Sequence, residues 1–515
     1  MERIAVLPID DQTADGSGAG IGAITVQILA AQLAAEPRAY VFPAADSNDA
    51  ASRRATRLVA GYLTKEAGAW TLHAALRDAA RQQTVRVLKD VTGSGAPALA
   101  DGLAAQLGTP AFTAVRLDPV ALEAALQGKG DVSILGPAAQ LRLTALPNDL
   151  AGRASLAERL SAATPADSET AQRAATLLLH AGRFAEGARI FDRALLAEPD
   201  WGELHNDAAF SYALAGRTTD ALKASAAYRR SDPESGNPQD TLGEVLCLLG
   251  AYPLGERQFL AGFDKPRFSV GSVNLPKTTL LRKAAEAARL ARNQAEADQI
   301  FAKYAEALRQ HPLLPLEQAQ WDYTSGRTEP ALRSLEEFAA KANLSAAWLQ
   351  LSLWRARAGN QRAAAAAAKL AVDTSRNAGE RNAGVMAQFV TQPDAPAAEW
   401  QLRAARQFPQ PQAALFARQA LVHALALHRQ WTEAAAAAEA LANSASAAVY
   451  NPWRYLRAAA LAEAGQPDQA RVYLKRGPLP RTTGEATWEF LYYPKLIELA
   501  PRIAPAALRE IETQL

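Results

Sequence analysis

The stretch TLLLHAGRFAEGARIFDRALLAEPD, residues 176–200, decides the fold of this chain, because the chain repeats its pattern 34 residues later. The repeat, FSYALAGRTTDALKASAAYRRSDPE, covers residues 210–234. Gly182, Gly216 and Gly250 follow one another at the same interval. A fixed period of this size is typical of helical hairpins that stack, since one hairpin alone cannot bury its apolar face. We therefore predict an all-α solenoid, whose elongated surface favours a binding role.

Each repeat carries its own signals for where helices end. Glycine stops the first helix because it adopts the left-handed conformation without steric cost. Phe184, Ala188 and Phe191 share one face of the second helix at i, i+4 and i+7 spacing. Pro199 and Pro233 close successive units at the same 34-residue interval. The pattern thus predicts antiparallel helix pairs.

Later units are recognised by a glycine or an aromatic residue followed by a small one. We count about nine hairpins in the region 168–515. Residues 268–278 are interpreted as a loop insertion, and the segment Trp488 to Leu515 as a carboxy-terminal cap, which arrays require. The later pairs of residues are Gly326 with Ala331, Gly359 with Ala364, Trp431 with Ala434, and Gly465 with Ala470.

The first hundred residues alternate strand and helix patterns instead. The stretches 3–8, 40–42, 57–64, 70–77 and 84–91 are apolar or β-rich, and 21–35 and 97–107 have helical periodicity. Glu66-Ala67-Gly68 and residues 79–83 are expected to be the turns of two antiparallel hairpins. A small α+β domain over residues 1–108 follows. Residues 109–167 are predicted to be a connector with short helices, one of which opens at Asp118-Pro119.

Composition excludes several classes of function. The 515 residues carry 55 Lys and Arg against 53 Asp and Glu, mixed along the chain, so no basic stripe for nucleic acid is expected. The longest uncharged stretch, residues 16–35, contains four glycines and two glutamines, which suits a buried helix better than a membrane span. We expect a cytoplasmic chain as it stands, or a periplasmic one if it is a fragment of a membrane-anchored protein.

The search for chemistry gives no candidate catalytic residue. Residues 18–23, GAGIGA, fit a dinucleotide fingerprint, but they lie far from the first strand, and antiparallel strands follow where a βαβ unit is needed. The six histidines lack metal-ligand spacing, and Cys247 lies in an apolar run, so it is interpreted as a buried hydrophobe. No enzyme, cofactor or metal is therefore predicted, although a glycine-rich loop could hold an anion.

The turn glycines, the small and aromatic positions and the closing prolines of residues 168–267 resemble the tetratricopeptide repeat. The resemblance implies a right-handed superhelix of hairpins, with defined positions of each first helix facing a groove. Carried onto this chain, it gives these candidate partner-binding residues: Gln172, Thr176, His180, Asn206, Phe210, Glu244, Gln320, Tyr323 and Arg357. Asp240 and Leu349 face the same way, and Trp348, Trp453 and Tyr455 would be the better binding residues if they face the surface.

The amino-terminal region resembles the TolB amino-terminal-like domain that accompanies tetratricopeptide arrays in bacterial regulators. The likeness rests on residues 4–8, IAVLP, and residues 59–63, VAGYL. It implies no catalytic residue. It departs from the family at Ile9, where an aromatic residue is usual.

These observations predict a non-enzymatic scaffold that binds a protein or peptide in the groove of the array, in a bacterial regulatory or envelope assembly. A homo-oligomer is compatible with the pattern. The alternative is the extracytoplasmic sensor region of a membrane-bound Ser/Thr kinase or transcriptional regulator, with a small ligand in the first domain. A third hypothesis, an enzyme with a novel site, would need a polar pocket in that domain.

Overall fold

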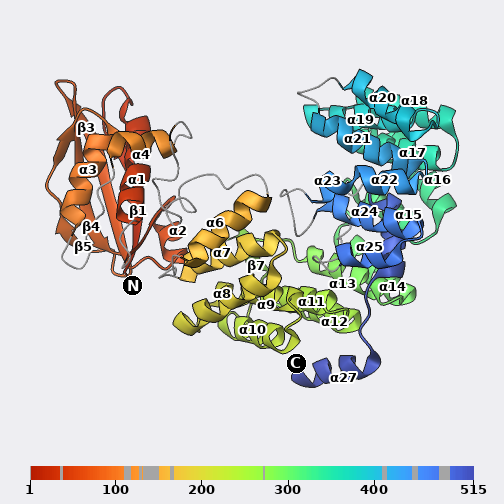
Figure 1. Ribbon diagram of the computed structural model, residues 1–515, viewed down its shortest axis with the longest axis horizontal. Coiled ribbons are helices and arrows are strands. Elements are labelled where there is room, and N and C mark those ends of the chain that lie inside the picture. Colours follow the sequence, from red (N-terminus) through yellow and green to blue (C-terminus); the bar gives the residue numbers. More distant parts are fainter. Residues whose placement is uncertain are drawn as a thin grey trace. The chain divides into compact units, whose positions relative to one another are not determined.

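The computed structural model describes residues 2–34, 39–108, 118–126, 130, 150–162, 168–270, 273–408, 414–443, 451–474 and 488–515. The chain divides into two compact units, residues 1–204 and 205–515. The first unit contains the mixed sheet and the first helices, and the second contains helices almost throughout (Figure 1). The predicted combination of an α+β region and a helical array is confirmed.

The sheet of the first unit follows the hydrophobic alternation of its strands. Its elements are β1 (Glu2–Asp11), α1 (Gly18–Ala34), β2 (Ala39–Pro43), α2 (Ser47–Ser52), β3 (Arg57–Glu66), β4 (Ala69–Asp78), β5 (Thr84–Val87), β6 (Val91–Gly93) and α3 (Ala96–Leu107). The strand order is β2-β1-β3-β4-β5, and β6 also pairs with β4. Ile4 and Val6 face α1 and α3, while Ala5 between them faces α2, as the two-residue period of a strand requires.

Two expectations about this sheet are wrong. β1 pairs in parallel with β2, so β1, α1 and β2 form a βαβ unit that the sequence analysis did not expect. The stretch 84–91, predicted as one strand, forms two short strands, β5 and β6, on the same edge of β4. The β3–β4 hairpin has the predicted turn, in which Ala67 and Gly68 both adopt positive φ.

Helices then follow one another in pairs, and the connector contributes α4 (Pro119–Leu126) and α6 (Leu150–Ala162). The Asp118 carboxylate accepts from the Val120 amide at 3.1 Å, as its predicted capping position requires. The first pairs are α7 (Ser168–His180) with α8 (Phe184–Ala197), α9 (Gly202–Leu214) with α10 (Thr218–Ser231), α11 (Asn237–Leu248) with α12 (Tyr252–Phe263), and α13 (Thr278–Leu290) with α14 (Gln294–Ala307).

The second unit continues with the same arrangement to its last helices. Its remaining elements are α15 (Leu314–Thr324) with α16 (Thr328–Ala342), α17 (Ser345–Arg357) with α18 (Gln361–Asp373), α19 (Ala378–Val390) with α20 (Ala397–Gln407), α21 (Ala414–Leu427) with α22 (Trp431–Ala437) and α23 (Glu439–Ala442), α24 (Pro452–Glu463) with α25 (Pro467–Leu474), and finally η2 (Glu489–Leu491), α26 (Tyr493–Leu499) and α27 (Pro505–Gln514). The predicted insertion holds a short hairpin, β7 (Ser269–Val270) and β8 (Val273–Asn274).

The repeat period has a direct backbone cause. Gly182, Gly216 and Gly250 have φ angles of +77°, +77° and +78°, and Gly326, Gly359 and Gly465 also lie in the left-handed region. Each ends a first helix, where a residue with a Cβ would be strained. The small residues predicted near the middle of the second helices, such as Ala188, Ala331 and Ala364, are fully buried. The hairpins are therefore held by tight turns and close helix packing.

Candidate partner-binding surface on the first helices

The first helices of the second unit carry polar side chains that are buried rather than solvated. Lys283 on α13 donates to Asp240 and, at 2.6 Å, to Glu244, both on α11. All three residues are less than one tenth exposed. Burial lowers the pKa of Lys283, and the carboxylate of Asp240 opposes this change. The result is a buried ion cluster that links two neighbouring repeats.

A second polar cluster continues along α13 toward α15. The guanidinium of Arg289 lies 3.5 Å from the ring centroid of Trp321 and donates to Thr324 Oγ1 at 2.9 Å and Ser325 Oγ at 3.1 Å. Arg282, two turns earlier, lies 5.1 Å from the same indole ring. Cations held over aromatic faces in this way fix their side chains while keeping their charge.

Aromatic and amide side chains extend this surface over α15 and α17. Gln320 Nε2 donates to Gln350 Oε1 at 2.9 Å. Tyr323 stacks on Trp354 with ring centroids 4.1 Å apart and nearly parallel planes. We call the faces of α11, α13, α15 and α17 that carry these groups the first-helix surface. This surface combines hydrogen-bonding groups with broad aromatic faces.

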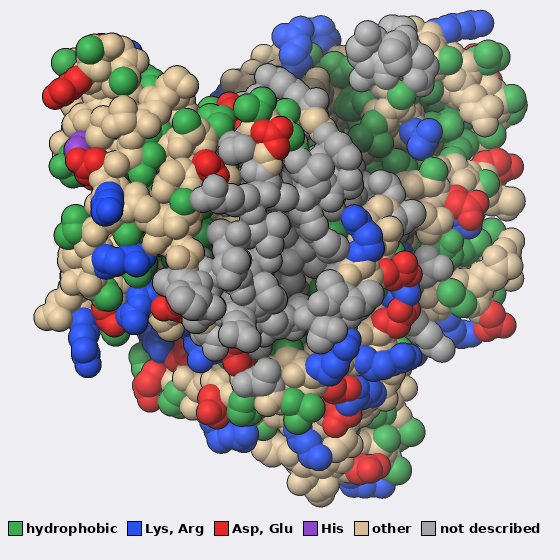
Figure 2. Space-filling model, turned by 60° about the vertical axis from the view of Figure 1, so that its left-hand side comes forward, with side chains coloured by type: hydrophobic (Ala, Val, Ile, Leu, Met, Phe, Trp, Pro, Cys, Tyr) green, Lys and Arg blue, Asp and Glu red, His purple; other side chains and the backbone are tan. Residues whose placement is uncertain are grey.

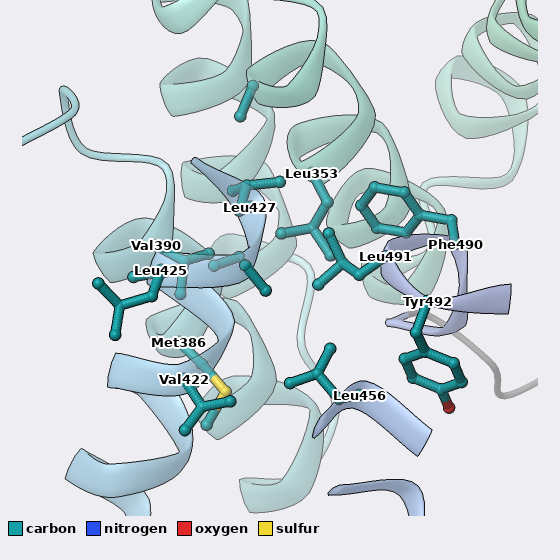
Figure 3. Close-up of a cluster of buried hydrophobic side chains, with 14 of the residues drawn as sticks. Leu353, Met386, Val390, Val422, Leu425, Leu427, Leu456, Phe490, Leu491 and Tyr492 are labelled. Atoms are coloured by element: carbon teal, nitrogen blue, oxygen red, sulfur yellow. The ribbon is translucent and has the colours of Figure 1, made fainter. Parts of the chain in front are cut away.

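The end of the chain, residues 488–515, contacts the first-helix surface and also α12, α21 and α24, and we call it the return segment. Trp488 stacks on His423 of α21 with ring centroids 3.8 Å apart. Phe490 meets Tyr323 edge to face at 5.7 Å. Figure 3 shows Phe490, Leu491 and Tyr492 of this segment beside Leu353 of α17 and Leu456 of α24. Tyr493 donates its hydroxyl hydrogen to Glu286.

The return segment then continues to the third repeat. Arg502 Nε donates to the Leu290 carbonyl at 3.1 Å, and the Ile503 amide donates to the Gly250 carbonyl at 3.3 Å. α27 packs through Ile511 against an apolar cluster that includes Leu246 of α11 and Leu254 of α12. In Figure 1, α27 accordingly lies by α11 and α12. The segment interpreted from sequence as a cap thus contacts several repeats.

The predicted groove residues of the second unit have different surroundings. Glu244 and Gln320 are buried and bonded within the chain, to Lys283 and Gln350 respectively. Tyr323 is half-buried between Trp354 and Phe490. Arg357 donates to the carbonyls of Ala426 and Leu427 at 3.1 and 2.7 Å, and burial lowers its pKa to about 10, with Arg429 acting in the same direction.

The candidates of the earlier repeats remain partly exposed. Gln172 and Thr176 lie on α7 and are bonded to each other through Thr176 Oγ1 and the Gln172 carbonyl. Burial lowers the pKa of His180 at the end of α7. On α9, Asn206 Oδ1 accepts from Thr241 Oγ1 of α11 at 2.6 Å, and Phe210 is half-buried. Asn206 therefore also links two repeats.

Sequence reasoning missed Lys283, Arg282, Arg289 and Glu286. The missed signal is the charge run of α13, where RKAAEAAR places four charges within residues 282–289 of a helix that is otherwise apolar. All four are buried, so they are not the solvated face that a charged helix usually has. Of the three aromatics whose binding role depends on facing the surface, Tyr455 is fully buried, whereas Trp348 and Trp453 are partly buried.

A carboxylate of the chain itself, that of Asp11, lies beside the start of the glycine-rich helix of the first unit. Gly18 begins α1, and hydrogen bonds from the side chain and amide of Thr13 to the Asp11 carboxylate lower the pKa of Asp11, with the amides of Gly18 and Ala19 acting in the same direction. A Cβ on Gly18 would lie 2.5 Å from Asp11 Oδ1. A phosphate would need the same amide groups. The Asp11 carboxylate therefore lies close to the amides that a phosphate at this helix start would use.

The open face of the sheet carries a hollow of about 540 Å³. His73 Nδ1 lies 2.8 Å from Asp90 Oδ1, its Nε2 lies 3.1 Å from Thr64 Oγ1, and its ring stacks on Tyr62 at 4.6 Å. Arg77 also lines the hollow. Within the described ranges, no group of three or more His, Cys, Asp or Glu side chains is arranged to hold a metal ion.

Among the described residues on the face drawn in Figure 2, Lys and Arg alternate with Asp and Glu, and neither sign of charge dominates a region. Cys247 lies against Gly255, and burial raises its pKa to about 12, as expected for an unreactive thiol. Of the helices in the described part of the chain, none combines the length and the apolar character that crossing a membrane requires.

The geometry thus defines a class of protein, a small mixed-sheet domain combined with an array of helical hairpins. No family model and no curated protein matches the chain. Among solved structures, it is similar to Pseudomonas aeruginosa pilF, with 16% identity over 42% of this chain and 94% of the other and a TM-score of 0.28. It is also similar to the C-terminal part of a TPR repeat-containing protein from Cytophaga hutchinsonii, with 17% identity over 59% of this chain and 99% of the other and a TM-score of 0.28. A third similar structure is the human IFIT1 dimer with PPP-AAAA, with 14% identity over 69% of this chain and 88% of the other and a TM-score of 0.26. With scores this low, the fold assignment rests on the chain's own repeats.

Proposed function

We propose that this chain is a non-enzymatic scaffold whose helical array binds a protein or peptide partner. The observation that carries the proposal is the return segment, a stretch of polypeptide that the first helices hold by aromatic contacts and a side-chain hydrogen bond. A surface that holds one polypeptide segment in this way has the groups needed to hold another.

Two separate faces are candidates for contact with a partner, that of α7 in the first unit and that of α9. Gln172, Thr176 and His180 on α7 and Asn206 and Phe210 on α9 are all partly exposed. Phe210 is the residue to which we assign most of the binding energy, because aromatic side chains at the centre of interfaces dominate affinity. Glu244, Gln320, Tyr323 and Arg357 would act by shaping the surface on which a partner lies.

The test compares capture of partners by the wild-type chain and by Phe210→Ala and Asn206→Ala variants, followed by mass spectrometry and titration of each captured protein. Thr241→Val is the matched control, because it removes the 2.6 Å hydrogen bond of Asn206 without changing Asn206. We expect Phe210→Ala to weaken binding roughly tenfold or more, as loss of an interface aromatic does. Equal affinity for all variants would exclude the α9 face, and equal losses in Asn206→Ala and Thr241→Val would assign Asn206 a structural role.

A second function is favoured by the hollow on the open sheet face. Its His73–Asp90 pair, the stacked Tyr62 ring and Arg77 form a mixed polar surface that could hold a small polar ligand. With the resemblance to the TolB amino-terminal-like domain, this supports the sensor region of a membrane-bound kinase or regulator as the alternative. A ligand screen that monitors the melting temperature of wild type and Tyr62→Ala would test it, since a ligand of this hollow should stabilise only the wild type.

A further inference from the structure

The contacts of the return segment differ from those of an ordinary helical cap. A cap covers an apolar end, whereas three aromatic side chains of this segment each meet a specific group on a different helix. Trp488 stacks on His423 of α21, Phe490 packs against Tyr323 of α15, and Tyr493 donates to Glu286 of α13. A buried hydrogen bond and ring contacts of this kind specify direction and register, which apolar packing alone does not.

The contact between the segment and the helices also leaves two buried polar atoms without hydrogen-bond partners. Glu489 has a buried Oε2 with no hydrogen-bond partner, and the buried Oε1 of Gln320 also lacks one. Both residues line one small void together with Arg282, Thr324, Gln350, Trp354 and Phe490. A buried carboxylate oxygen that gains no hydrogen bond destabilises the state that contains it. Another segment without this acid would fit the same place better.

We propose, building on the scaffold function above, that the return segment is the resident occupant of a peptide-binding surface, and that the partner which replaces it is a protein segment with aromatic side chains in the order Trp-x-Phe-x-x-Tyr. The pattern is that of residues 488–493. The tryptophan lies on His423, the phenylalanine fills the place beside Tyr323, and the tyrosine hydroxyl bonds Glu286. A free binding partner must compete with an occupant that is covalently attached.

The attachment determines what an experiment will measure. A tethered segment has an effective concentration in the millimolar range, far above that of most partners. If the surface is open in about 1% of molecules, the apparent Kd of a free peptide rises about 100-fold. Cutting the connection between Leu474 and Trp488 removes this advantage without deleting any residue of the segment.

The experiment therefore uses the full chain with one specific protease site inserted between Leu474 and Trp488. The probe is a fluorescent synthetic peptide of residues 488–515, and its anisotropy is measured before and after cleavage and dilution. We expect cleavage to tighten binding of the probe about 100-fold, as the removed competition predicts. A cleaved chain that keeps its own segment and takes up no probe, or that loses its helical circular dichroism, would overturn the proposal, because the segment would then be part of the fold.

Variants of the probe test the recognition pattern. Trp488→Ala, Phe490→Ala and Tyr493→Phe should each weaken binding roughly tenfold, as loss of a stack or a buried hydrogen bond does, whereas Glu510→Ala, at an exposed position of α27, should not. On the chain, Glu286→Gln should weaken binding, and the exposed Arg309→Gln is its control. Equal binding by a peptide of residues 488–499 and by its scrambled counterpart would refute the pattern.

The partner class is tested with a peptide that carries Trp-x-Phe-x-x-Tyr in an alanine and serine background. It should displace the probe from the cleaved chain, and failure to do so would overturn the assignment of the partner. These measurements use only this chain and peptides. Failure of the peptides to bind would not change the result expected for Phe210→Ala. An unchanged affinity of Phe210→Ala would likewise not change the results expected for the peptides.

Discussion

The indole of Trp488 stacks on the imidazole of His423, with ring centroids 3.8 Å apart and an interplanar angle of 19°. The imidazole also meets Trp453 at 4.7 Å, so it lies between two aromatic side chains. This enclosure removes His423 from water, and burial lowers its pKa from 6.5 to about 3. The contact between the return segment and α21 therefore depends on a neutral histidine.

The second unit should lose stability in mild acid because of His423. The unfolded chain binds a proton near pH 6.5 and the folded chain only near pH 3, so the contribution is present above pH 6.5 and is lost as pH falls. The loss should reach about 1.4 kcal/mol per pH unit at its steepest. Urea unfolding between pH 7 and 4 measures it. His423→Phe, which keeps the stack, should reduce the slope, and the exposed His311→Gln should leave it unchanged.

Glu489 should make the stability of the second unit fall as pH rises, which is opposite to the effect of His423. Burial, with the nearby carboxylate of Glu286, raises its pKa from 4.5 to about 8, and Arg282 only partly opposes this. The protonated carboxyl is favoured in the folded chain, so its contribution is present below pH 4.5 and is lost as pH rises through 8.

A Glu489→Gln variant should accordingly match the wild type near pH 4.5 and exceed its stability at pH 8. The gap should widen by up to about 1.4 kcal/mol per pH unit between these values. Melting temperatures at pH 5 and pH 8 measure it, with the more exposed Glu498→Gln as control. A gap of constant size at both pH values would contradict the titration of Glu489.

The features that the sequence predicted are those fixed locally. A turn that needs positive φ selects glycine, and Gly182, Gly216 and Gly250 therefore reveal the repeat. The turn between α13 and α14 escaped recognition because Arg292 adopts φ +63° there. The predicted run over residues 84–91 divides into β5 and β6 because the partner strand, β4, sets their separate registers. Pairing of β5 and β6 with β4 is a tertiary contact, which the local sequence does not show.

The surroundings of the candidate site depend on contacts between distant residues. The periodicity predicted that Glu244 and Gln320 lie on first helices, yet not that Lys283 and Gln350 would bond them. Tyr493 and Glu286 are separated by 207 residues, and no spacing rule links them. In a helical array each repeat normally contacts only its neighbours. The repeat pattern therefore does not predict a segment that contacts several repeats, and only the three-dimensional arrangement reveals it.

The buried ion cluster gives a further prediction. Lys283→Met should destabilise the second unit by about 3–5 kcal/mol, because it leaves Asp240 and Glu244 as buried carboxylates without their cation. Lys303→Met, at an exposed position on α14, should change stability by less than about 0.5 kcal/mol. Adding Asp240→Asn and Glu244→Gln to Lys283→Met should recover most of the loss in urea unfolding. A triple variant no more stable than the single one would show that the charges are not the cause.

Two turn glycines of the array offer a matched pair for the contact with the return segment. Gly216 and Gly250 have φ angles of +77° and +78°, so alanine at either position bears the same backbone strain, about 1–2 kcal/mol. Around Gly216 an added Cβ meets no atom within 4 Å, whereas at Gly250 it would lie 2.6 Å from the Pro501 carbonyl oxygen.

Gly250→Ala should therefore cost more than Gly216→Ala, and the difference should be the cost of moving the return segment away from α11. We expect this excess to be about 1–3 kcal/mol, as for other steric insertions into packed regions. Thermal unfolding of the two variants measures it, and hydrogen exchange over residues 501–515 should rise only in Gly250→Ala. Equal losses in the two variants, with unchanged exchange, would mean that Pro501 does not lie against this turn in solution.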